Sequence, residues 1–265
     1  MGNHRVAEPL KIALALSGGA GRGAFHTGVL QAIEDEGFEV AVLSGNSIGA
    51  IIACSFASGV RPKEILNILS SKGVKKAIRF NFLRKSLFYI NENSPLFSQL
   101  FNGYQSLEKL PIPVTVYATN LNSGEYTGLD KGDLISSCIA SASAWPILKP
   151  TSIDNELYID GGYMNNLPIE SLLQSKLPII AVDLHPKTQT TIKSFFAILK
   201  RLIFLSWQSS VIKQKEFCTL YIGDERIRKI SMFSFKDSQK AFNLGYELAT
   251  EKLQSYKSSL CLKNI

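Results

Sequence analysis

Residues 40–60 restrict the possible folds of this chain more than any other feature, because this run contains no charged residue. A helix that spans a bilayer needs about 20 predominantly apolar residues, so length alone would allow a membrane span. The middle of the run, however, reads Gly45-x-Ser47-x-Gly49. Glycine and serine at the centre do not suit a membrane helix. The run instead predicts a buried strand at residues 40–43, a tight turn and a helix.

The pattern Gly45-x-Ser47-x-Gly49 between a strand and a helix is typical of a serine nucleophile. The serine occupies a sharp turn from which its hydroxyl projects, and the flanking glycines let strand and helix approach without side-chain clashes. The helix, expected at residues 48–58, would point its N-terminal N–H groups toward developing negative charge. Ser47 is therefore a candidate nucleophile. A lone hydroxyl is weakly nucleophilic, so it needs a base and an oxyanion site.

Apolar runs and amphipathic segments alternate along the rest of the chain. Residues 12–16 form a continuous apolar run, which is typical of a strand buried on both faces. Helices are expected at residues 24–36, ended by Gly37, and at residues 238–254. Further strands are expected at residues 114–119 and 179–184. This alternation predicts an α/β fold with a mostly parallel sheet that helices cover on both faces.

Composition favours one globular domain in a reducing compartment. With 265 residues and 45% hydrophobic content, residues 1–265 are expected to form a single domain. The four cysteines include no Cys-x-x-Cys pair and stand beside no histidine cluster, so neither a disulfide framework nor a metal site is expected. Charged residues near the start, such as Arg5 and Lys11, do not fit a signal peptide. We therefore expect a cytoplasmic protein.

The net charge of +7 is concentrated in residues 75–91 and 187–215, which contain no acidic residue. Large apolar side chains are interleaved with the basic ones, at residues 77–83, 87–90, 195–199 and 202–205. Two interpretations stay open: core elements with a solvated basic edge, or a lid or interfacial surface that admits lipid chains. The local basicity favours an anionic partner such as the inner membrane surface, to which the protein would bind peripherally. No nucleic acid is expected. The basic residues are Lys75, Lys76, Arg79, Arg84, Lys85, Lys187, Lys193, Lys200, Arg201, Lys213 and Lys215.

A second glycine-rich turn, residues 17–23, follows the first strand. It could cradle a phosphate, but Ala20 interrupts the Gly-x-Gly-x-x-Gly pattern and no Gly-Lys-Ser/Thr follows. Backbone N–H groups exposed in such a turn can also form an oxyanion hole, which needs no further fingerprint. The candidate donors are Gly18, Gly19, Ala20, Gly21, Arg22 and Gly23.

Asp160 is one candidate for the base that would deprotonate the serine. It ends the hairpin-like residues 156–159 and precedes Gly161 and Gly162, in a turn that would expose its carboxylate. The dipeptide Asp160-Gly161 is also common in ordinary turns, so this pattern alone leaves the role of Asp160 as the base open.

His185 is the competing candidate. It lies just past the expected strand at residues 179–184 and would give the chain order Ser47, Asp160, His185 of an α/β-hydrolase triad. Such a triad would suit a soluble esterase or a peptidase. His26 lies within the first expected helix, where a structural role is the more common one.

Four ordered segments resemble the patatin-like phospholipase family. The resemblance covers about residues 10–185, and residues 186–265 are similar in layout to the C-terminal strand and helices of compact bacterial members. It implies a patatin-like fold and a serine-dependent hydrolase of fatty-acyl esters or phospholipids, with no cofactor. Ser47 would be the acylated nucleophile, Asp160 the base, and the amides of residues 18–23 the oxyanion hole, while His26 would be structural. The segments are residues 16–30 (LSGGAGRGAFHTGVL), 45–50 (GNSIGA), 140–146 (ASASAWP) and 160–168 (DGGYMNNLP).

One departure from the family concerns the glycine turn. The family usually has glycine at the position of Ala20 and a small residue such as alanine at the position of Gly21. If Ala20 adopts a positive φ, its side chain introduces strain of about 1 kcal/mol or more. A catalytically silent lipid-binding protein therefore remains an alternative. For an active enzyme, burial would have to raise the pKa of Asp160 above the usual value of about 3.9.

Overall fold

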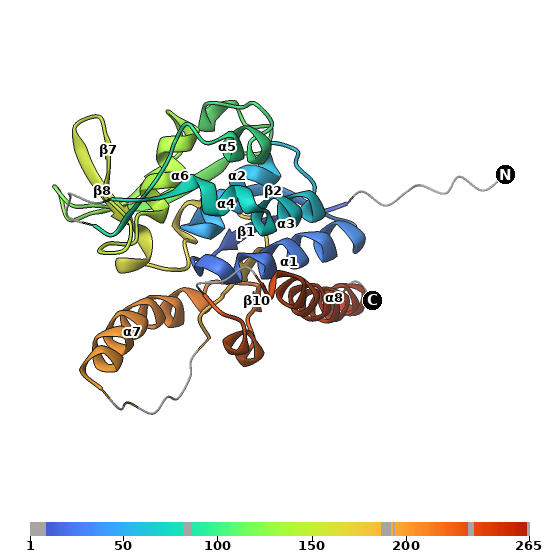
Figure 1. The fold of residues 1–265 in the computed structure, drawn as a ribbon. Coiled ribbons are helices and arrows are strands. Elements are labelled where there is room, and N and C mark those ends of the chain that lie inside the picture. Colours follow the sequence, from blue (N-terminus) through green and yellow to red (C-terminus); the bar gives the residue numbers. More distant parts are fainter. Residues whose placement is uncertain (1–8, 82–85, 187–191, 193, 233–235, 264–265) are drawn as a thin grey trace.

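The computed structural model describes residues 9–81, 86–186, 192, 194–232 and 236–263. Within these ranges the centre is an eight-stranded mixed sheet (Figure 1). Its parallel part has the order β10 (Leu220–Ile222), β9 (Ile179–Val182), β1 (Leu10–Leu16), β2 (Phe38–Asn46) and β5 (Val114–Asn120). Three antiparallel strands continue it, β8 (Glu156–Asp160), β7 (Thr151–Ile153) and β6 (Tyr126–Leu129), of which β8 and β6 both pair with β5. The mostly parallel sheet predicted from the sequence is confirmed.

Strand β1 shows why both faces of the sheet are covered. Ile12, Leu14 and Leu16 belong to one apolar cluster, whereas Ala13 and Ala15 belong to another, and all five are fully buried. Successive side chains of a strand point to opposite faces, so β1 is buried from both sides. The bulky residues meet the helices of one face, and the alanines leave room for close packing on the other.

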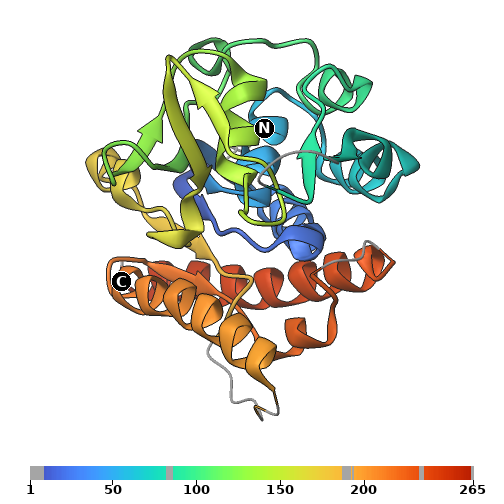
Figure 2. The same ribbon diagram turned by 60° about the vertical axis from the view of Figure 1, so that its left-hand side comes forward.

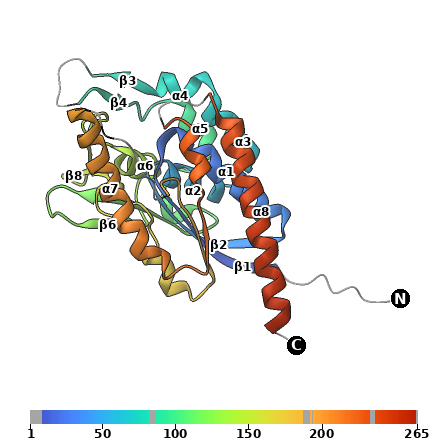
Figure 3. The same ribbon diagram turned by 90° about the horizontal axis from the view of Figure 1, so that it is seen from below.

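On the first face, four helices cover the sheet: α1 (Ala24–Asp35), α2 (Ile48–Ala57), α3 (Pro62–Ser70) and α8 (Ser238–Lys263). Helix α8 lies along α1 (Figures 1 and 3). A Cβ atom on Gly28 of α1 would lie 2.0 Å from the carbonyl oxygen of Phe242, and one on Gly245 of α8 would lie 2.2 Å from that of Phe25. The two glycines therefore allow the helix backbones to approach closely.

The opposite face carries η4 (Glu170–Ser175) and the long helix α7 (Phe195–Lys215). Leu167, Ile169 and Leu172 pack against the alanines of β1, and Val211 of α7 joins the same cluster. Figure 2 shows α7 (orange) below the strands of the sheet. Helix α7 therefore borders the same face of the sheet as residues 167–172, which follow β8 in the chain.

The remaining elements connect these layers. The hairpin of β3 (Ile78–Phe80) and β4 (Phe88–Ile90) forms a separate two-stranded sheet. Three hydrogen bonds attach it to the segment after α6. The N–H groups of Leu87 and Phe88 donate to the carbonyls of Pro146 (3.1 Å) and Ile147 (2.8 Å), and the N–H of Lys149 donates to the carbonyl of Phe88 (2.9 Å). The other elements are η1 (Ala20–Gly23), α4 (Lys72–Ala77), α5 (Pro95–Leu100), η2 (Leu107–Lys109), α6 (Leu134–Ala142), η3 (Gly161–Tyr163) and η5 (Glu225–Lys229).

The predicted elements recur in the structure with small changes at their ends. Residues 12–16, 24–36, 40–43, 48–58, 114–119 and 179–184 correspond to β1, α1, β2, α2, β5 and β9. The C-terminal helix begins at Ser238 as predicted but continues to Lys263, beyond the predicted end at residue 254. Tertiary contacts hold the additional turns, because Tyr256 stacks on Phe38 and Lys257 forms an ion pair with Glu36.

Several apolar residues of the two acid-free segments lie on the surface, although Ala77 and Val211 belong to the core. Phe80 of β3 is 51% exposed and Leu202 of α7 is 58% exposed. Of the basic residues named from the sequence, Arg84, Lys85, Lys187 and Lys193 lie outside the described residues. No helix in the described part of the chain is both long and apolar enough to cross a bilayer.

Candidate active site

Ser47 lies on the turn between β2 and α2 and has φ 53° and ψ −124°. Positive φ is uncommon for a residue other than glycine and marks a strained turn. The flanking glycines allow this turn: a Cβ atom on Gly45 would lie 2.5 Å from Cα of Ala50, and one on Gly49 would lie 2.3 Å from the carbonyl oxygen of Leu16. Larger residues at either position would push strand and helix apart.

A serine on α6 supports the turn from the other side. The backbone N–H of Ser47 donates to Oγ of Ser141 at 2.7 Å, and that hydroxyl donates to the carbonyl of Tyr117 at 2.6 Å. The Ser47 amide is thereby bound within the protein, and its strained backbone is held by a residue from another element.

Asp160 is the last residue of β8 and lies beside Ser47. Strand β8 pairs with β5, which in turn pairs with β2, so the ends of β2 and β8 meet at one edge of the sheet. The Ser47 hydroxyl is close enough to the Asp160 carboxyl to act on its pKa, which it lowers by favouring the charged form. The N–H of Gly162 donates to Oδ1 of Asp160 at 2.8 Å. The structure thus brings the predicted nucleophile and the predicted base into contact.

Burial raises the pKa of Asp160 to about 6, because the residue is only 5% exposed and the charged form of its carboxyl is poorly solvated. Hydrogen bonds from Gly162, Ser47 and Asn46 act in the opposite direction, since they stabilise the carboxylate. A carboxyl group with a pKa near 6 is ionised at neutral pH and yet basic enough to accept a serine proton.

The glycine turn after β1 lies next to the serine. A Cβ atom on Gly18 would be 3.1 Å from Cβ of Ser47, and one on Gly19 would be 2.4 Å from Cδ1 of Leu184. Ala20 has φ 49°, the left-handed conformation in which alanine is strained. The sequence predicts strain at Ala20 if this residue has a positive φ, and the structure shows that it has.

The turn offers fewer donors than the sequence suggested. The N–H of Gly21 donates to the carbonyl of Met232 at 2.8 Å, and the N–H of Arg22 donates to the carbonyl of Gly19 at 3.2 Å. These two amides have partners inside the protein and cannot at the same time serve an oxyanion. The candidate oxyanion donors are thereby narrowed from six residues to Gly18, Gly19, Ala20 and Gly23.

The side chain of Arg22 has a structural position. It is 7% exposed, and its guanidinium donates to the carbonyls of Ile230 and Leu184, each at 3.0 Å. Burial lowers its pKa from the usual value. Arg22 therefore attaches the glycine turn to the chain segments that follow β9 and η5.

Neither buried histidine contacts the serine. His26 on α1 donates through Nε2 to the carbonyl of Ser17 at 2.8 Å, and burial lowers its pKa to about 4. His185 accepts through Nδ1 from the side-chain amide of Asn166 at 3.1 Å, and burial lowers its pKa to about 3. A histidine with so low a pKa is a poor base at neutral pH, so the geometry disfavours the triad.

Three residues at the site were not recognised from the sequence: Asn46, Ser141 and Asn166. Each lies inside one of the four segments that resemble the family, but an asparagine or a serine at these positions does not by itself indicate a role. Asn46 donates through Nδ2 to Asp160 and to Asn166. For the two asparagines, a signal was available in the sequence: Asn46 directly precedes Ser47, and Asn166 follows closely after Asp160.

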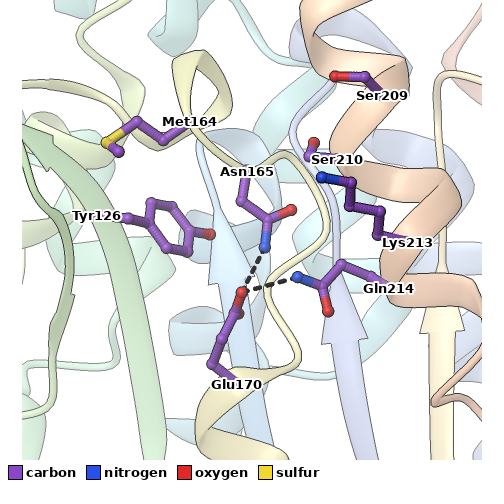
Figure 4. Close-up of a pocket in the computed structure, with 8 residues that line it drawn as sticks. All are labelled: Tyr126, Met164, Asn165, Glu170, Ser209, Ser210, Lys213 and Gln214. Carbon is purple, nitrogen blue, oxygen red and sulfur yellow. Dashed lines mark hydrogen bonds between the residues drawn. The ribbon is translucent and has the colours of Figure 1, made fainter.

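A cavity of about 320 Å³ lies beside the site, between the segment after η3 and α7 (Figure 4). Glu170 accepts hydrogen bonds there from Asn165 (2.6 Å) and Gln214 (2.9 Å), while Tyr126 and Lys213 complete its walls. Neither the serine nor the aspartate of the site lines this cavity, which is therefore distinct from the reaction centre. No cluster of three metal-ligating side chains occurs among the described residues.

The sheet is mostly parallel, a strained serine lies at a strand–helix turn, and a buried carboxyl and a glycine turn lie beside it. These features define an α/β protein with the strand–turn–helix geometry that is typical of a nucleophile elbow. The patatin-like phospholipase family model matches residues 14–173 of this chain. The chain belongs to the patatin-like phospholipase family.

Relatives of known sequence and structure agree with this assignment. An NTE family protein of Mycobacterium tuberculosis is 30% identical over 184 residues, which cover 68% of this chain and 51% of the relative. Lysophospholipase NTE1 of Candida albicans is 29% identical over 191 residues, 68% of this chain and 13% of that protein. The chain thus spans about half or less of these relatives. The structure of VipD from Legionella pneumophila shares the fold, with a TM-score of 0.51 and 14% identity over 94% of this chain and 67% of that one.

Proposed function

We propose that this protein is a serine-dependent lipid acyl hydrolase that works with a Ser47–Asp160 dyad. The observation that carries the proposal is the position of Ser47, on a strained turn, beside the buried Asp160 carboxyl, whose pKa is raised to about 6. Membership of the patatin-like phospholipase family supports the same class of reaction.

In the acylation step, Asp160 takes the hydroxyl proton while Oγ of Ser47 attacks the carbonyl carbon of an acyl ester. The developing oxyanion would be stabilised by the amides of the glycine turn, Gly18 and Gly19 first among them. Collapse of the tetrahedral intermediate breaks the bond to the leaving alcohol, which receives the proton from Asp160. An ester of Ser47 and the free alcohol result.

In the deacylation step, water takes the place of the alcohol. Asp160 accepts a proton from this water as it attacks the acyl-serine, and it returns the proton to Oγ of Ser47 when the acid is released. Both half-reactions need Asp160 as the carboxylate at the start, so kcat/KM is expected to rise with pH through about 6.

The substrate class we propose is a fatty-acyl ester of the phospholipid or lysophospholipid type. One relative is named a lysophospholipase, and the edge of the sheet that carries the dyad is bordered by exposed apolar side chains. Trp145 and Ile147 follow α6, and Met164 lies four residues beyond Asp160; these three are between 41% and 50% exposed. Such an apolar border can receive acyl chains.

We further propose that this border docks on an anionic lipid surface. The β3–β4 hairpin and the start of α7 lie toward the same end of the molecule in Figures 1 and 3. Along α7, Ile198, Leu202 and Leu205 are each more than 40% exposed and repeat at helical spacing. Basic residues on or beside these elements supply the complementary charge: Lys75 and Lys76 lie on α4 directly before the hairpin, Arg79 lies on β3 and Arg201 lies on α7.

Covalent labelling with a fluorophosphonate probe tests the nucleophile without knowledge of the natural substrate. We expect one modified peptide, which contains Ser47, and no labelling of a folded Ser47→Ala variant. Hydrolysis of p-nitrophenyl butyrate and of a lysophospholipid should disappear in the same variant. Activity within a few-fold of the parent, in a preparation free of other esterases, would refute the assignment.

Two further variants separate the dyad from the alternatives. Asp160→Asn should remove most activity, because an amide cannot accept the serine proton, whereas His185→Ala should retain the dyad chemistry if it folds. A loss of several orders of magnitude at His185 with an unchanged Tm would favour the triad of a soluble esterase or peptidase. Lipid binding with neither labelling nor turnover would indicate a catalytically silent protein.

A further inference from the structure

Asn46 connects Asp160 to a line of buried side chains. It is fully buried, and its Nδ2 lies 3.4 Å from Oδ1 of Asp160 and 3.2 Å from Oδ1 of Asn166. Both neighbours are acceptors, so the amide must present its NH₂ group to them. The contact with Asp160 is long for a hydrogen bond, and the acceptor supplied by Asn166 therefore contributes to the orientation of Asn46.

Asn166 is oriented in turn by His185. Its Nδ2 donates to Nδ1 of His185 at 3.1 Å, and its backbone N–H donates to Oγ of Ser210 on α7 at 3.1 Å. With Nδ2 directed at the imidazole, the opposite end of the amide, Oδ1, faces Asn46. The imidazole accepts at Nδ1 and so carries its proton on Nε2.

His185 is fixed by β9 and α7. Its backbone N–H donates to Oδ1 of Asp183 at 2.7 Å, and its ring makes edge contacts with Phe204 and Trp207 at centroid distances of 5.2 and 5.1 Å. Burial lowers the pKa of His185 to about 3, with further lowering by the charge of Arg22. The imidazole is therefore a neutral acceptor throughout the pH range in which the protein works.

From these contacts we propose that Asn46, Asn166 and His185 form a positioning chain that holds the Asp160 carboxylate toward Ser47. The inference rests on the proposed function, because it matters only if Asp160 is the base. His185 acts through Asn166, and Asn166 acts through Asn46, so all three are positioning residues. The chain gives the buried histidine a role other than that of a catalytic base.

The pH dependence of kcat/KM tests the positioning chain, because the acid limb of the profile reports the pKa of the base in the free enzyme. The titratable groups near Asp160 are Tyr163, with a pKa raised to about 12, and Tyr126, whose pKa is raised well above its usual value. Neither titrates near the acid limb. Near His185, Arg22 stays charged, and burial lowers the pKa of His26 to about 4.

With p-nitrophenyl butyrate as substrate, Asn46→Ala should move the acid limb upward by about half to one pH unit, because Asp160 loses a donor to its charged form. Asn166→Ala should move it in the same direction by less. Asn165→Ala is the matched control, since this neighbouring asparagine is 5% exposed, against 2% for Asn166, but donates to Glu170 instead. The control should leave the acid limb in place.

A double variant distinguishes a chain from two separate effects. If Asn166 acts through Asn46, then Asn46→Ala with Asn166→Ala should shift the acid limb no further than Asn46→Ala alone. Additive shifts would overturn the proposed order. An unshifted acid limb in both folded single variants would overturn the chain as a whole.

Substitutions of His185 test the far end of the chain. His185→Asn can place an amide oxygen near the position of Nδ1 and should keep the acid limb close to that of the parent, whereas His185→Leu should shift it as Asn166→Ala does. Equal profiles for the two folded variants would contradict the role of His185. Asp160→Asn separates this proposal from the proposed function: full activity of that variant refutes the base itself, while an inactive variant with unshifted profiles elsewhere refutes only the chain.

Discussion

Asp160 is destabilising to the folded protein when it is ionised. Burial raises its pKa from 3.8 to about 6, so between these values the folded protein binds more protons at this site than the unfolded chain does. Stability therefore falls as the pH rises through this window. A shift of about two pH units corresponds to roughly 3 kcal/mol.

We expect Asp160→Asn to have a higher Tm than the parent at about pH 8. The difference should vanish only at about pH 3 or below, where Asp160 of the parent is protonated in both the folded and the unfolded state. Calorimetry across this range measures both. Asp224→Asn provides the opposite case, because the hydrogen bond from Arg226 lowers the pKa of Asp224 and the amide should destabilise the protein at neutral pH. A lower Tm of Asp160→Asn at high pH would contradict the role of burial.

At the glycine turn, we predict that Ala20→Gly is tolerated and leaves kcat unchanged or higher. The φ of 49° strains alanine by about 1 kcal/mol, and glycine relieves that strain. Chemical denaturation measures the effect of Ala20→Gly on the free energy of unfolding, and steady-state kinetics measure its effect on kcat.

In contrast, Gly19→Val should lower kcat, because a Cβ atom there would meet Leu184 at 2.4 Å and displace the turn from Ser47. Loss of one oxyanion donor reduces kcat by a factor on the order of 10²–10³ in other enzymes. A folded Gly19→Val protein with the kcat of the parent would place the oxyanion hole elsewhere.

At the scale of elements, the contact of α1 with α8 depends on the absence of side chains at the crossing. In an exposed helix, replacing glycine by alanine stabilises by about 1 kcal/mol. We predict the reverse for Gly28→Ala in α1, with a loss of several kcal/mol in urea unfolding, because the new methyl group would meet the backbone of Phe242 at 2.0 Å.

Gly73→Ala in α4 is the matched control for this prediction. Its nearest neighbour, the Ser71 hydroxyl at 3.0 Å, belongs to a side chain that can move. The control should therefore be nearly neutral. Equal unfolding free energies of the two variants would show that the α1–α8 contact adjusts without cost.

At the scale of the whole molecule, exposed apolar residues and basic charge occur together on the segments that border the site. The protein should therefore sediment with anionic phosphatidylglycerol vesicles far better than with neutral phosphatidylcholine vesicles, and it should be released as salt rises. Each basic residue near an anionic surface contributes about 1 kcal/mol, and screening by salt weakens this within a Debye length of roughly 8 Å.

Paired variants locate the docking surface. Leu202→Glu with Leu205→Glu on α7 should weaken vesicle binding and leave hydrolysis of p-nitrophenyl butyrate intact. Leu262→Glu is the control. This leucine is 74% exposed, but it lies at the end of α8, the helix that covers the opposite face of the sheet from α7. Binding that ignores lipid charge and salt would mean that the basic segments are only solvated surface.

Local patterns were sufficient for the turn at Ser47 and for four strands of the sheet, β1, β2, β5 and β9. The Gly45-x-Ser47-x-Gly49 turn, the apolar run of β1 and the glycine that ends α1 are set by sterics and periodicity within a few residues of chain. The end of α8 was underestimated, because contacts of Tyr256 and Lys257 with distant residues prolong the helix.

Contacts between residues far apart in the chain decided what the local patterns left open. From residue types alone, His185 and Asp160 were both candidates for the base, and only the resemblance to a family favoured the dyad. The pairing of β8 with β5 carries Asp160 to Ser47, while Asn166 and the aromatic residues of α7 hold His185. Burial, hydrogen-bond partners and pKa depend on which segments meet. No pattern within a single segment contains that information, and so the contacts and the burial of Asp160 and His185 are properties of the tertiary structure.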